Sequence, residues 1–564
     1  MGSVLARRLP VCSLIVLALL GGRARASYLD DIGLTQLQAE QGSALASGTG
    51  MRVCQVEAEL DANTQSYTPD PNSFVSGKVF NFKSGTYAPS WHATDVGEYF
   101  YGTWGAAPGI STVDVYAANS PAAPLGWMGN GFLNTGNARS LPNVEAGRIE
   151  NHSWVGAITP SSSNTEILRR LDYAINRDGF LAVVGLNNAG SGATEMPLLA
   201  ESYNALSVGR SDGGAIGGYT ALEGPGRVLP DIVAPMGATS WATPLVSGSA
   251  AVLLQTADNN PLWTDARSNS EVIKSMLMAG ATKQQLPGWS RTTTRPLDPN
   301  YGAGQLNIYN SYHILTGGEH AASTSANLPG TSLTDGWDFE TITSSSTQRQ
   351  YYFTVPAGCA LRDFSTVLNW NRTITPVAKY GLPYYQWNSS LANLDLQLSQ
   401  ASNFVVGSTV DASQSPIDNV EHIYRGAADP NLPTSTNELG PGQYALSVSA
   451  NFAGTSLTSS DYALAWRGSL MVEDPAQVAL PGDFNLDGKV DGVDFLIWQS
   501  HYGTASGATL LNGDANGDGN VDGVDFLTWQ AAYRPGITTV PEPAAALLLL
   551  AAGSLLRRGR KRLA

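Results

Sequence analysis

The stretch ATSWATPLVSGSAAVLL, residues 238–254, decides the fold of this chain of 564 residues. Ser240 stands shortly before Pro244, which marks a helix start, and small apolar residues follow. A serine at the head of a helix faces the positive end of the helix dipole, where backbone N–H groups stabilise a developing anion. We therefore predict that Ser240 is a nucleophile, provided that a base lies within reach.

This stretch resembles the active-site serine segment of the subtilase (subtilisin-like) serine proteases. The family pattern is Gly-Thr-Ser-x-Ala-Thr-Pro-x-Val-Ser-Gly. The chain matches it at Thr239, Ser240, Ala242, Thr243, Pro244, Val246, Ser247 and Gly248, and Ala238 replaces the first Gly. The resemblance implies an α/β domain with a mainly parallel sheet flanked by helices. It also implies hydrolysis of a polypeptide substrate by a triad that needs no cofactor. The alternative is a helix of small residues packed in a core.

The base is expected at His92. Of the six histidines, only this one has a recognisable setting, HATDVGEYFYG at 92–102. That segment resembles the family's His-Gly-Thr-His-Val-Ala-Gly, although Ala93 replaces a Gly and Asp95 replaces the second His. His152 lies instead in a segment that resembles the family's substrate-binding strand. The side chains expected to line the cleft there are Ser153, Trp154 and Val155.

The oxyanion donor is expected in FLAVVGLNNAGSG, residues 180–192. The segment resembles the family's Val-Ala-Ala-Ala-Gly-Asn-x-Gly, in which the Asn side chain holds the oxyanion. Aligned on Gly190, Asn188 takes that role, and a shift of one residue would give it to Asn187. The alternative is an Asn-rich turn that ends a strand.

The acid departs from the family. GTGMRVCQVEAEL, residues 48–60, corresponds to the family's first strand, and Glu57 stands where the family has Asp. Glutamate keeps the carboxylate but adds a methylene, and a misplacement of about 1 Å can cost on the order of 100-fold in rate. Two hypotheses follow. The chain is an endopeptidase in which Glu57 orients His92, or it is a catalytically inactive subtilase fold that serves as a surface or matrix binding module.

A motif occurs twice near the C-terminus, as GDFNLDGKVDGVDFLIWQ at 482–499 and GDANGDGNVDGVDFLTWQ at 513–530. Oxygen ligands stand at positions 1, 3, 5, 9 and 12 of a twelve-residue loop, and position 7 offers a carbonyl, as a Ca²⁺ site requires. The predicted ligands are Asp483, Asn485, Asp487, Lys489, Asp491, Asp494, Asp514, Asn516, Asp518, Asn520, Asp522 and Asp525. The repeat resembles a dockerin type I domain, which implies a cohesin-like partner. A Ca²⁺-stapled spacer without such a partner is the alternative.

Both ends of the chain resemble targeting segments. Residues 1–26 combine Arg7 and Arg8, an apolar stretch and Ala-Arg-Ala, as a secretory signal peptide does. Residues 540–564 combine Pro-Glu-Pro, a short apolar run and a basic tail, and resemble the bacterial PEP-CTERM sorting signal. The resemblance implies export to the cell envelope and processing by an exosortase-type enzyme. A plain C-terminal membrane anchor is the alternative.

The pattern along the chain predicts several regions. They are a subtilase-like domain at 28–316, a linker at 317–334, a jelly-roll-like β-sandwich at 335–470 and a dockerin-like repeat at 481–534. The net charge of −15 argues against nucleic acid as a partner. Cys54 and Cys359 are expected to be free buried thiols, and we expect a monomer.

Overall fold

The computed structural model describes residues 28–533, except 61–64, 86–87, 119–124, 137–139, 192, 223–225, 324–333, 356–357, 380–383, 427–436, 473–480, 485–489, 506–507, 509 and 517. The expected signal peptide (1–26) and sorting signal (540–564) lie outside these residues, as do Asn485, Asp487 and Lys489. None of the helices in the described part has the length and apolar character needed to cross a bilayer.

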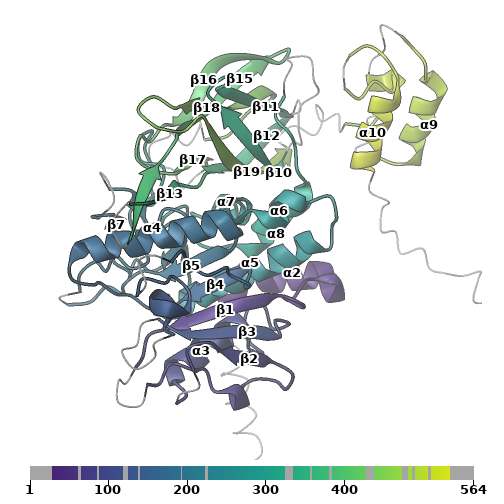
Figure 1. Cartoon of the computed structure of the whole chain (residues 1–564). Helices are drawn as coiled ribbons and strands as arrows, with labels where there is room; N and C mark the ends of the chain where they lie inside the picture. Colours follow the sequence, from purple (N-terminus) through teal and green to yellow (C-terminus); the bar gives the residue numbers. More distant parts are fainter. Residues whose placement is uncertain are drawn as a thin grey trace, which may run out of the picture. The chain divides into compact units, whose positions relative to one another are not determined.

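The first part of the chain forms a seven-stranded sheet in the order β2-β3-β1-β4-β5-β6-β9 (Figure 1). All neighbouring strands in it run parallel. The strands are β1 (Arg52–Glu57), β2 (Val79–Phe82), β3 (Thr112–Ala117), β4 (Ile149–His152), β5 (Leu181–Gly185), β6 (Leu206–Arg210) and β9 (Ile232–Ala234). A short antiparallel pair, β7 (Gly218–Tyr219) and β8 (Val228–Leu229), lies between β6 and β9 in the chain.

Helices cover both faces of this sheet, which explains why its strands are apolar on both sides. Successive residues of β1, such as Val53 and Cys54, pack into different hydrophobic clusters on opposite faces of the sheet. The first cluster contains α2 (Leu34–Gln41), α5 (Thr239–Asp258), α7 (Ser270–Gly280) and α8 (Ile308–Gly317). The second contains α4 (Ser161–Asp178). The remaining helices here are α3 (Trp91–Phe100) and α6 (Thr264–Ser268).

The order of the strands creates a switch point beside β1. From β1 the chain builds β2 and β3 on one side, and it then continues with β4 on the other side. Crevices outside the carboxyl ends of parallel strands form at such points. Glu57 is the last residue of β1, and Ser153 directly follows β4, so both lie at this edge.

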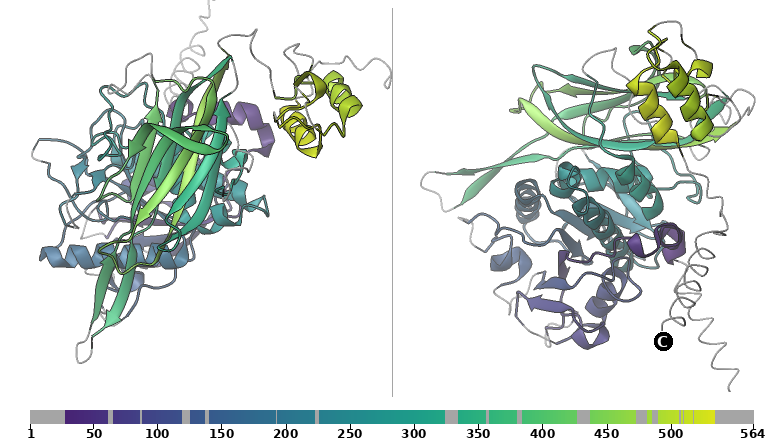
Figure 2. Two further views of the ribbon diagram at one scale, coloured as in Figure 1. Left: turned by 90° about the horizontal axis from the view of Figure 1, so that it is seen from above. Right: turned by 90° about the vertical axis from the view of Figure 1, so that its right-hand side faces the viewer.

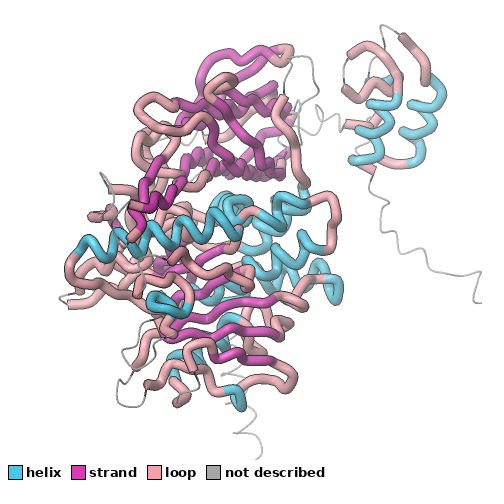
Figure 3. Tube along the Cα trace, in the orientation of Figure 1, coloured by secondary structure: helices cyan, strands magenta, loops and turns pink. Residues whose placement is uncertain are grey.

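Two four-stranded sheets follow, in the orders β10-β19-β12-β17 and β11-β18-β15-β16 (Figures 2 and 3). Their strands are β10 (Asp335–Thr343), β11 (Gln348–Val355), β12 (Cys359–Asn369), β15 (Asn393–Ser402), β16 (Val405–Ser413), β17 (Val420–Arg425), β18 (Gly442–Asn451) and β19 (Ser459–Val472), with a separate hairpin of β13 (Thr373–Ala378) and β14 (Tyr385–Ser390). Within these two sheets, β10–β19, β11–β18, β12–β17, β15–β16 and β15–β18 pair antiparallel. The predicted order of a parallel α/β region followed by antiparallel sheets is confirmed.

The sandwich and the α/β region pack as one unit through buried polar groups. Arg372 Nε donates to Asp172 Oδ2 at 2.8 Å, and the Arg372 backbone N–H donates to Asn204 Oδ1 at 2.7 Å. Asn419 Nδ2 donates to the Tyr203 carbonyl at 2.8 Å. Loss of one member of such a buried ion pair leaves an uncompensated charge, which is strongly destabilising.

The last described helices, α9 (Gly492–His501) and α10 (Gly523–Ala532), belong to a second unit. Each helix begins with a capping box, formed by Asp491 with Asp494 and by Asp522 with Asp525. The two halves exchange equivalent bonds. Trp498 Nε1 donates to the Asp522 carbonyl at 2.9 Å, and Trp529 Nε1 donates to the Asp491 carbonyl at 3.0 Å. The sequence repeat is therefore a structural repeat.

Candidate active site

Ser240 is the second residue of α5, which begins at Thr239 after an extended Ala238. The sequence interpretation that Pro244 marks the helix start is wrong, because Pro244 lies inside the helix. A proline has no N–H to donate to the carbonyl four residues earlier, which here belongs to Ser240. Ser153 Oγ donates to that carbonyl instead, at 2.9 Å. The proline thus leaves the Ser240 carbonyl free to accept the bond from Ser153. That bond ties the end of β4 to the first turn of α5.

The segment after β4, expected to line the cleft, is tied to α5 by further bonds. Asn151 Nδ2 donates to Ser153 Oγ at 3.0 Å, and Ser247 Oγ donates to Asn151 Oδ1 at 2.8 Å. Ser153 and Trp154 are buried, with 4% and 7% of their surface exposed, and Val155 is half-buried. The Ser153 hydroxyl therefore holds the first turn of α5, the helix that carries Ser240, a contact that the sequence interpretation missed.

The side chains of His92 and Glu57 lie in contact at the carboxyl end of β1. His92 is the second residue of α3, whose first turn is capped by the Ser90 hydroxyl. His92 Nδ1 lies 2.9 Å from Glu57 Oε2, and the two side chains are 18% and 1% exposed. The longer glutamate side chain thus reaches the imidazole from the end of β1.

Two further side chains hold Glu57 in place. Gln55 Nε2 donates both to Glu57 Oε1, at 3.0 Å, and to the Ala93 carbonyl, at 2.8 Å. The Tyr101 hydroxyl donates to Gln55 Oε1. The Gln55 amide is therefore bonded at both ends. One Glu57 oxygen is anchored by Gln55 and the other faces His92.

The environment of His92 raises the pKa of its imidazole. Burial is the largest single influence and acts to lower the pKa, but the hydrogen bond and charge of Glu57, together with the charge of Asp95, outweigh it. An imidazolium that forms during a reaction would therefore be stabilised by these carboxylates.

Asn187 and Asn188 follow β5, and their side-chain amides form hydrogen bonds with different partners. Asn188 Oδ1 accepts the backbone N–H of Thr239 at 3.0 Å, which places its amide group beside the first turn of α5. Asn187 Nδ2 donates to the Thr194 carbonyl at 2.8 Å, within its own loop. Of the two amides, only that of Asn188 is bonded to the residue next to Ser240.

The helices that carry His92 and Ser240 pack against each other. A Cβ at Gly248 of α5 would lie 2.6 Å from the Ala106 Cβ and 3.1 Å from the Phe100 carbonyl oxygen, so a glycine is needed at this contact. Near the helix head, the Trp241 ring lies 6.2 Å from the ring of Tyr99 in α3. The fold therefore brings the predicted base and nucleophile to neighbouring helices.

His152 is unsuited to the role of a base. It is fully buried, its Nδ1 accepts from Trp154 Nε1 at 3.3 Å, and its Nε2 lies 3.1 Å from Glu150 Oε2. Burial lowers the pKa of His152 to about 3, although nearby carboxylates oppose the shift. It is a neutral part of the protein interior, in keeping with its expected place in a strand.

In the second repeat, the predicted Ca²⁺ ligands Asp514 and Asp525 accept hydrogen bonds from the backbone of their own loop. Asp525 accepts from the Ala515 and Asp522 backbone at 2.9 and 2.8 Å, and Asp514 Oδ2 accepts the Gly519 N–H at 2.7 Å. Gly519, with a φ of +84°, makes the sharp turn. These donor atoms are hard oxygens, and they fit a calcium ion.

Comparison with known protein families supports the predicted dockerin-like repeat. Residues 481–530 match the family described as Dockerin type I domain. Similar solved structures include fervidolysin from Fervidobacterium pennivorans, a keratinolytic enzyme related to subtilisin, which is 14% identical. That match covers 71% of this chain and 69% of fervidolysin, with a TM-score of 0.33.

Two other similar structures are also proteases. The serine protease of Aeromonas sobria is 12% identical, and the match covers 75% of this chain and 89% of that one, with a TM-score of 0.31. The self-cleaved protease domain of PatA is 17% identical, and the match covers 48% of this chain and 98% of that one, with a TM-score of 0.30. Structural similarity at these identities and TM-scores does not define a function. Any proposed chemistry therefore has to be argued from the residues of this chain.

Proposed function

We propose that this chain is an exported, subtilisin-like serine endopeptidase whose triad is Ser240, His92 and Glu57. The observation that carries the proposal is the 2.9 Å contact between Glu57 Oε2 and His92 Nδ1, at the switch point of a parallel sheet. A carboxylate in this position keeps the proton on Nδ1 and leaves Nε2 as the acceptor for a serine proton.

In the proposed reaction, Ser240 Oγ attacks the scissile carbonyl carbon while its proton passes to His92 Nε2. Asn188 Nδ2 and backbone N–H groups at the head of α5 stabilise the tetrahedral oxyanion. The imidazolium then gives its proton to the leaving amine, which departs with the C–N electron pair. Water, activated by His92, hydrolyses the acyl-enzyme and restores Ser240.

The competing proposal is an inactive binding module, and the substituted positions Glu57, Ala238 and Asp95 favour it. Against it stands the geometry of the acid. One oxygen of the Glu57 carboxylate is held by Gln55 and the other faces the imidazole, and an inactive site does not require this orientation. This arrangement favours the active enzyme.

A fluorophosphonate probe decides between these proposals. Such a probe phosphonylates an activated serine and releases fluoride, so we expect one equivalent bound to wild type at Ser240, located by peptide mass mapping. Ser240→Ala should not be labelled. Ser249→Ala, which alters a buried hydroxyl further along α5, should label as wild type. A correctly folded wild type that stays unlabelled would reject the enzyme.

Asn188→Ala is expected to lower kcat by about 100- to 1000-fold with little change in KM, because one oxyanion donor is lost. Asn187→Ala is the matched control, since its amide bonds to Thr194 within its own loop. Steady-state kinetics on a chromogenic peptide would test this. A full loss of activity at Asn187 with none at Asn188 would show that the alignment is one residue off.

We further propose that residues 481–534 bind two Ca²⁺ ions and fold on binding, because the clustered acidic side chains repel one another without a cation. Calorimetry on this isolated segment should give a stoichiometry near two, and EDTA should reduce its helical circular dichroism signal. Asp514→Ala should lower the stoichiometry to one. Ellipticity that EDTA leaves unchanged, together with no heat of binding, would contradict the proposal.

The dockerin match supports an extracellular or cell-surface location, and a cohesin-like domain is the partner that it favours. A spacer without a cohesin partner is the alternative. Signal-peptide cleavage and exosortase processing remain proposals from the sequence, since both segments lie outside the described residues. We propose that the chain acts as a monomer on polypeptide substrates.

A further inference from the structure

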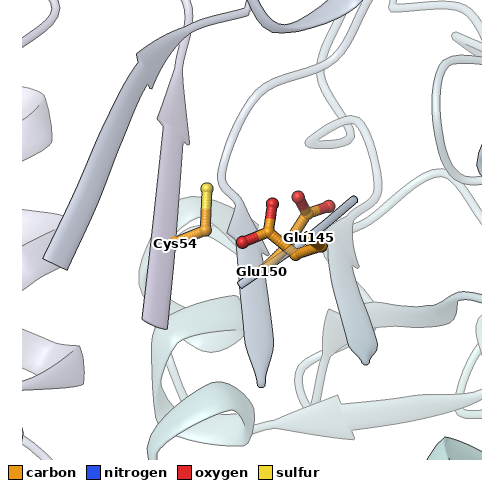
Figure 4. A group of neighbouring side chains, drawn as sticks. All are labelled: Cys54, Glu145 and Glu150. Atoms are coloured by element: carbon orange, nitrogen blue, oxygen red, sulfur yellow. The ribbon is translucent and has the colours of Figure 1, made fainter. Parts of the chain in front are cut away.

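A second cluster of reactive side chains lies within the α/β region, apart from the proposed triad. It consists of Cys54 in the middle of β1, Glu150 in β4 and Glu145, which precedes β4 in the chain (Figure 4). Cys54 and Glu150 are register partners in the parallel sheet, so their side chains leave it on the same face. The thiol sulfur and one oxygen of each carboxyl group all lie within 4.8 Å of one another.

The cluster is buried and lacks a cationic partner. Cys54 and Glu150 have no exposed surface, and Glu145 is half-buried. Among the described residues, the side chains that bond to Glu150 are those of Trp127, His152 and Glu145, and none of them carries a positive charge. Burial, together with the charge of Glu150, raises the pKa of Glu145 to about 9, and burial raises the pKa of Glu150 to about 8. Glu145 and Glu150 also share a side-chain hydrogen bond, which requires a proton on one of the two carboxyl groups.

Hydrogen bonds from neighbouring groups hold both carboxyl groups of the cluster in place. Trp127 Nε1 donates to Glu150 Oε1 at 3.1 Å, and His152 Nε2 lies 3.1 Å from Glu150 Oε2. Because the indole of Trp154 donates to His152 Nδ1, the imidazole proton sits on Nε2 and points at Glu150. The Gly147 N–H donates to Glu145 Oε1 at 2.5 Å.

The thiol is the member of the cluster that these bonds leave out. Cys54 is a free cysteine whose side chain is wholly buried, and no described residue forms a hydrogen bond with it. Figure 4 shows its sulfur pointing to the side of β1 on which the two carboxyl groups lie. A buried thiol and two carboxyl groups whose ligand atoms lie within 4.8 Å of one another are residue types that bind a divalent transition metal.

We propose that Cys54, Glu145 and Glu150 bind a divalent transition metal of the Zn²⁺ class. Zinc takes one thiolate at about 2.3 Å and carboxylate oxygens at about 2.0–2.2 Å, and three protein ligands leave one position for water. The three donor atoms, which lie within 4.8 Å of one another, would move closer together to reach these distances. The thiolate disfavours Ca²⁺ and Mg²⁺, which prefer oxygen ligands.

Such an ion would join β1, β4 and the segment before β4, and Trp127 and His152 would act as the supporting shell that orients its carboxylate ligand. It would lie at the level of Cys54, three residues before Glu57 in β1. The proposed hydrolysis takes no step through it. The metal proposal is therefore independent of the peptidase proposal, and each can fail alone.

Cobalt substitution tests the proposal, because only a thiolate ligand gives Co²⁺ a strong sulfur-to-metal charge-transfer band in the near ultraviolet. The starting protein is the full chain carrying Cys12→Ala and Cys359→Ala, in which Cys54 is the last of the three cysteines. After EDTA treatment and refolding with Co²⁺, this protein should show the band at one equivalent per chain, and Zn²⁺ should abolish it. The oxygen-only Ca²⁺ loops cannot contribute to it.

Two variants of that background sharpen the result. Cys54→Ala should remove the band entirely, and Glu150→Gln should weaken metal binding by about 10-fold or more, read as a rightward shift of the titration. Zn²⁺ should raise the Tm of the parent protein but not that of Cys54→Ala. A folded parent that shows no band, and whose Tm is unchanged by Zn²⁺, would overturn the proposal and leave protons as the occupants of the cluster.

Discussion

Replacing Ser240 with alanine is expected to lower kcat on a peptide substrate by about a millionfold, because the atom that forms the acyl bond is gone. His92→Ala should cost about as much, since the serine hydroxyl is a weak nucleophile without its base. The double variant should be no worse than either single variant, because the two residues act as one unit. Single-turnover hydrolysis of a chromogenic peptide would measure all three.

The control for this prediction is Ser249→Ala, in the same helix. Its hydroxyl is buried and has no hydrogen-bond partner among the described residues, so its loss should leave both kcat and Tm nearly unchanged. Far-ultraviolet circular dichroism should show that Ser240→Ala is folded. Equal hydrolysis by wild type and folded Ser240→Ala would remove Ser240 from the mechanism.

The residues proposed to carry the chemistry could be picked out from the sequence because each lies in a local motif. Ser240 heads a helix, His92 stands in a recognisable helix start, and Asn188 follows a buried strand. Glu57 could be placed by its position at the end of the first strand, although the subtilase pattern that the segment resembles has Asp there. Local sequence indicates element ends well, and active-site groups on parallel sheets collect at element ends.

The supporting contacts could not be predicted, because they join residues that are distant in the chain. Tyr101 reaches Gln55 across 46 positions, and Ser153 reaches the Ser240 carbonyl across 87. Gln55 alone leaves a weak cue, as a polar residue in an apolar strand two positions before Glu57, on the same face. Such contacts depend on how the strands are ordered in the sheet, which no local pattern specifies.

The same limit applies to the sandwich. Its strands could be predicted from alternating apolar residues, but the pattern contains nothing about the surface on which it rests. The ion pair of Arg372 with Asp172 spans 200 positions. Buried charges on both sides of this contact show that the sandwich is integrated with the α/β region rather than appended to it.

Glu57→Gln is expected to lower kcat by about 10⁴-fold, although it changes the shape of the side chain very little. Gln55 Nε2 donates to Glu57 Oε1, so the new amide must turn its oxygen toward Gln55 and its nitrogen toward His92. That nitrogen donates to Nδ1 and forces the imidazole proton onto Nε2, where Ser240 needs an acceptor. The loss therefore arises from the wrong tautomer and not from a missing contact.

The pH profile separates this explanation from simple damage to the fold. Burial lowers the pKa of His92, but Glu57 and Asp95 raise it above its ordinary value, so the wild type should lose activity as the pH falls through that raised value. In Glu57→Gln one of the raising charges is gone, so the pKa falls and the acid limb of kcat/KM moves to lower pH. A reduced plateau with an unshifted acid limb would contradict the pairing.

The variant Glu57→Asp tests whether the geometry of the site requires the longer side chain of glutamate. The shorter side chain keeps the charge but withdraws the carboxylate by about one bond length from His92, and a misplacement of about 1 Å costs on the order of 100-fold. We therefore expect kcat to fall about 100-fold, while the acid limb stays closer to wild type than in Glu57→Gln. If aspartate instead raises the activity, the glutamate is a defect in an ancestral triad. Because Gln55 already anchors one oxygen of the longer side chain, the geometry favours the loss.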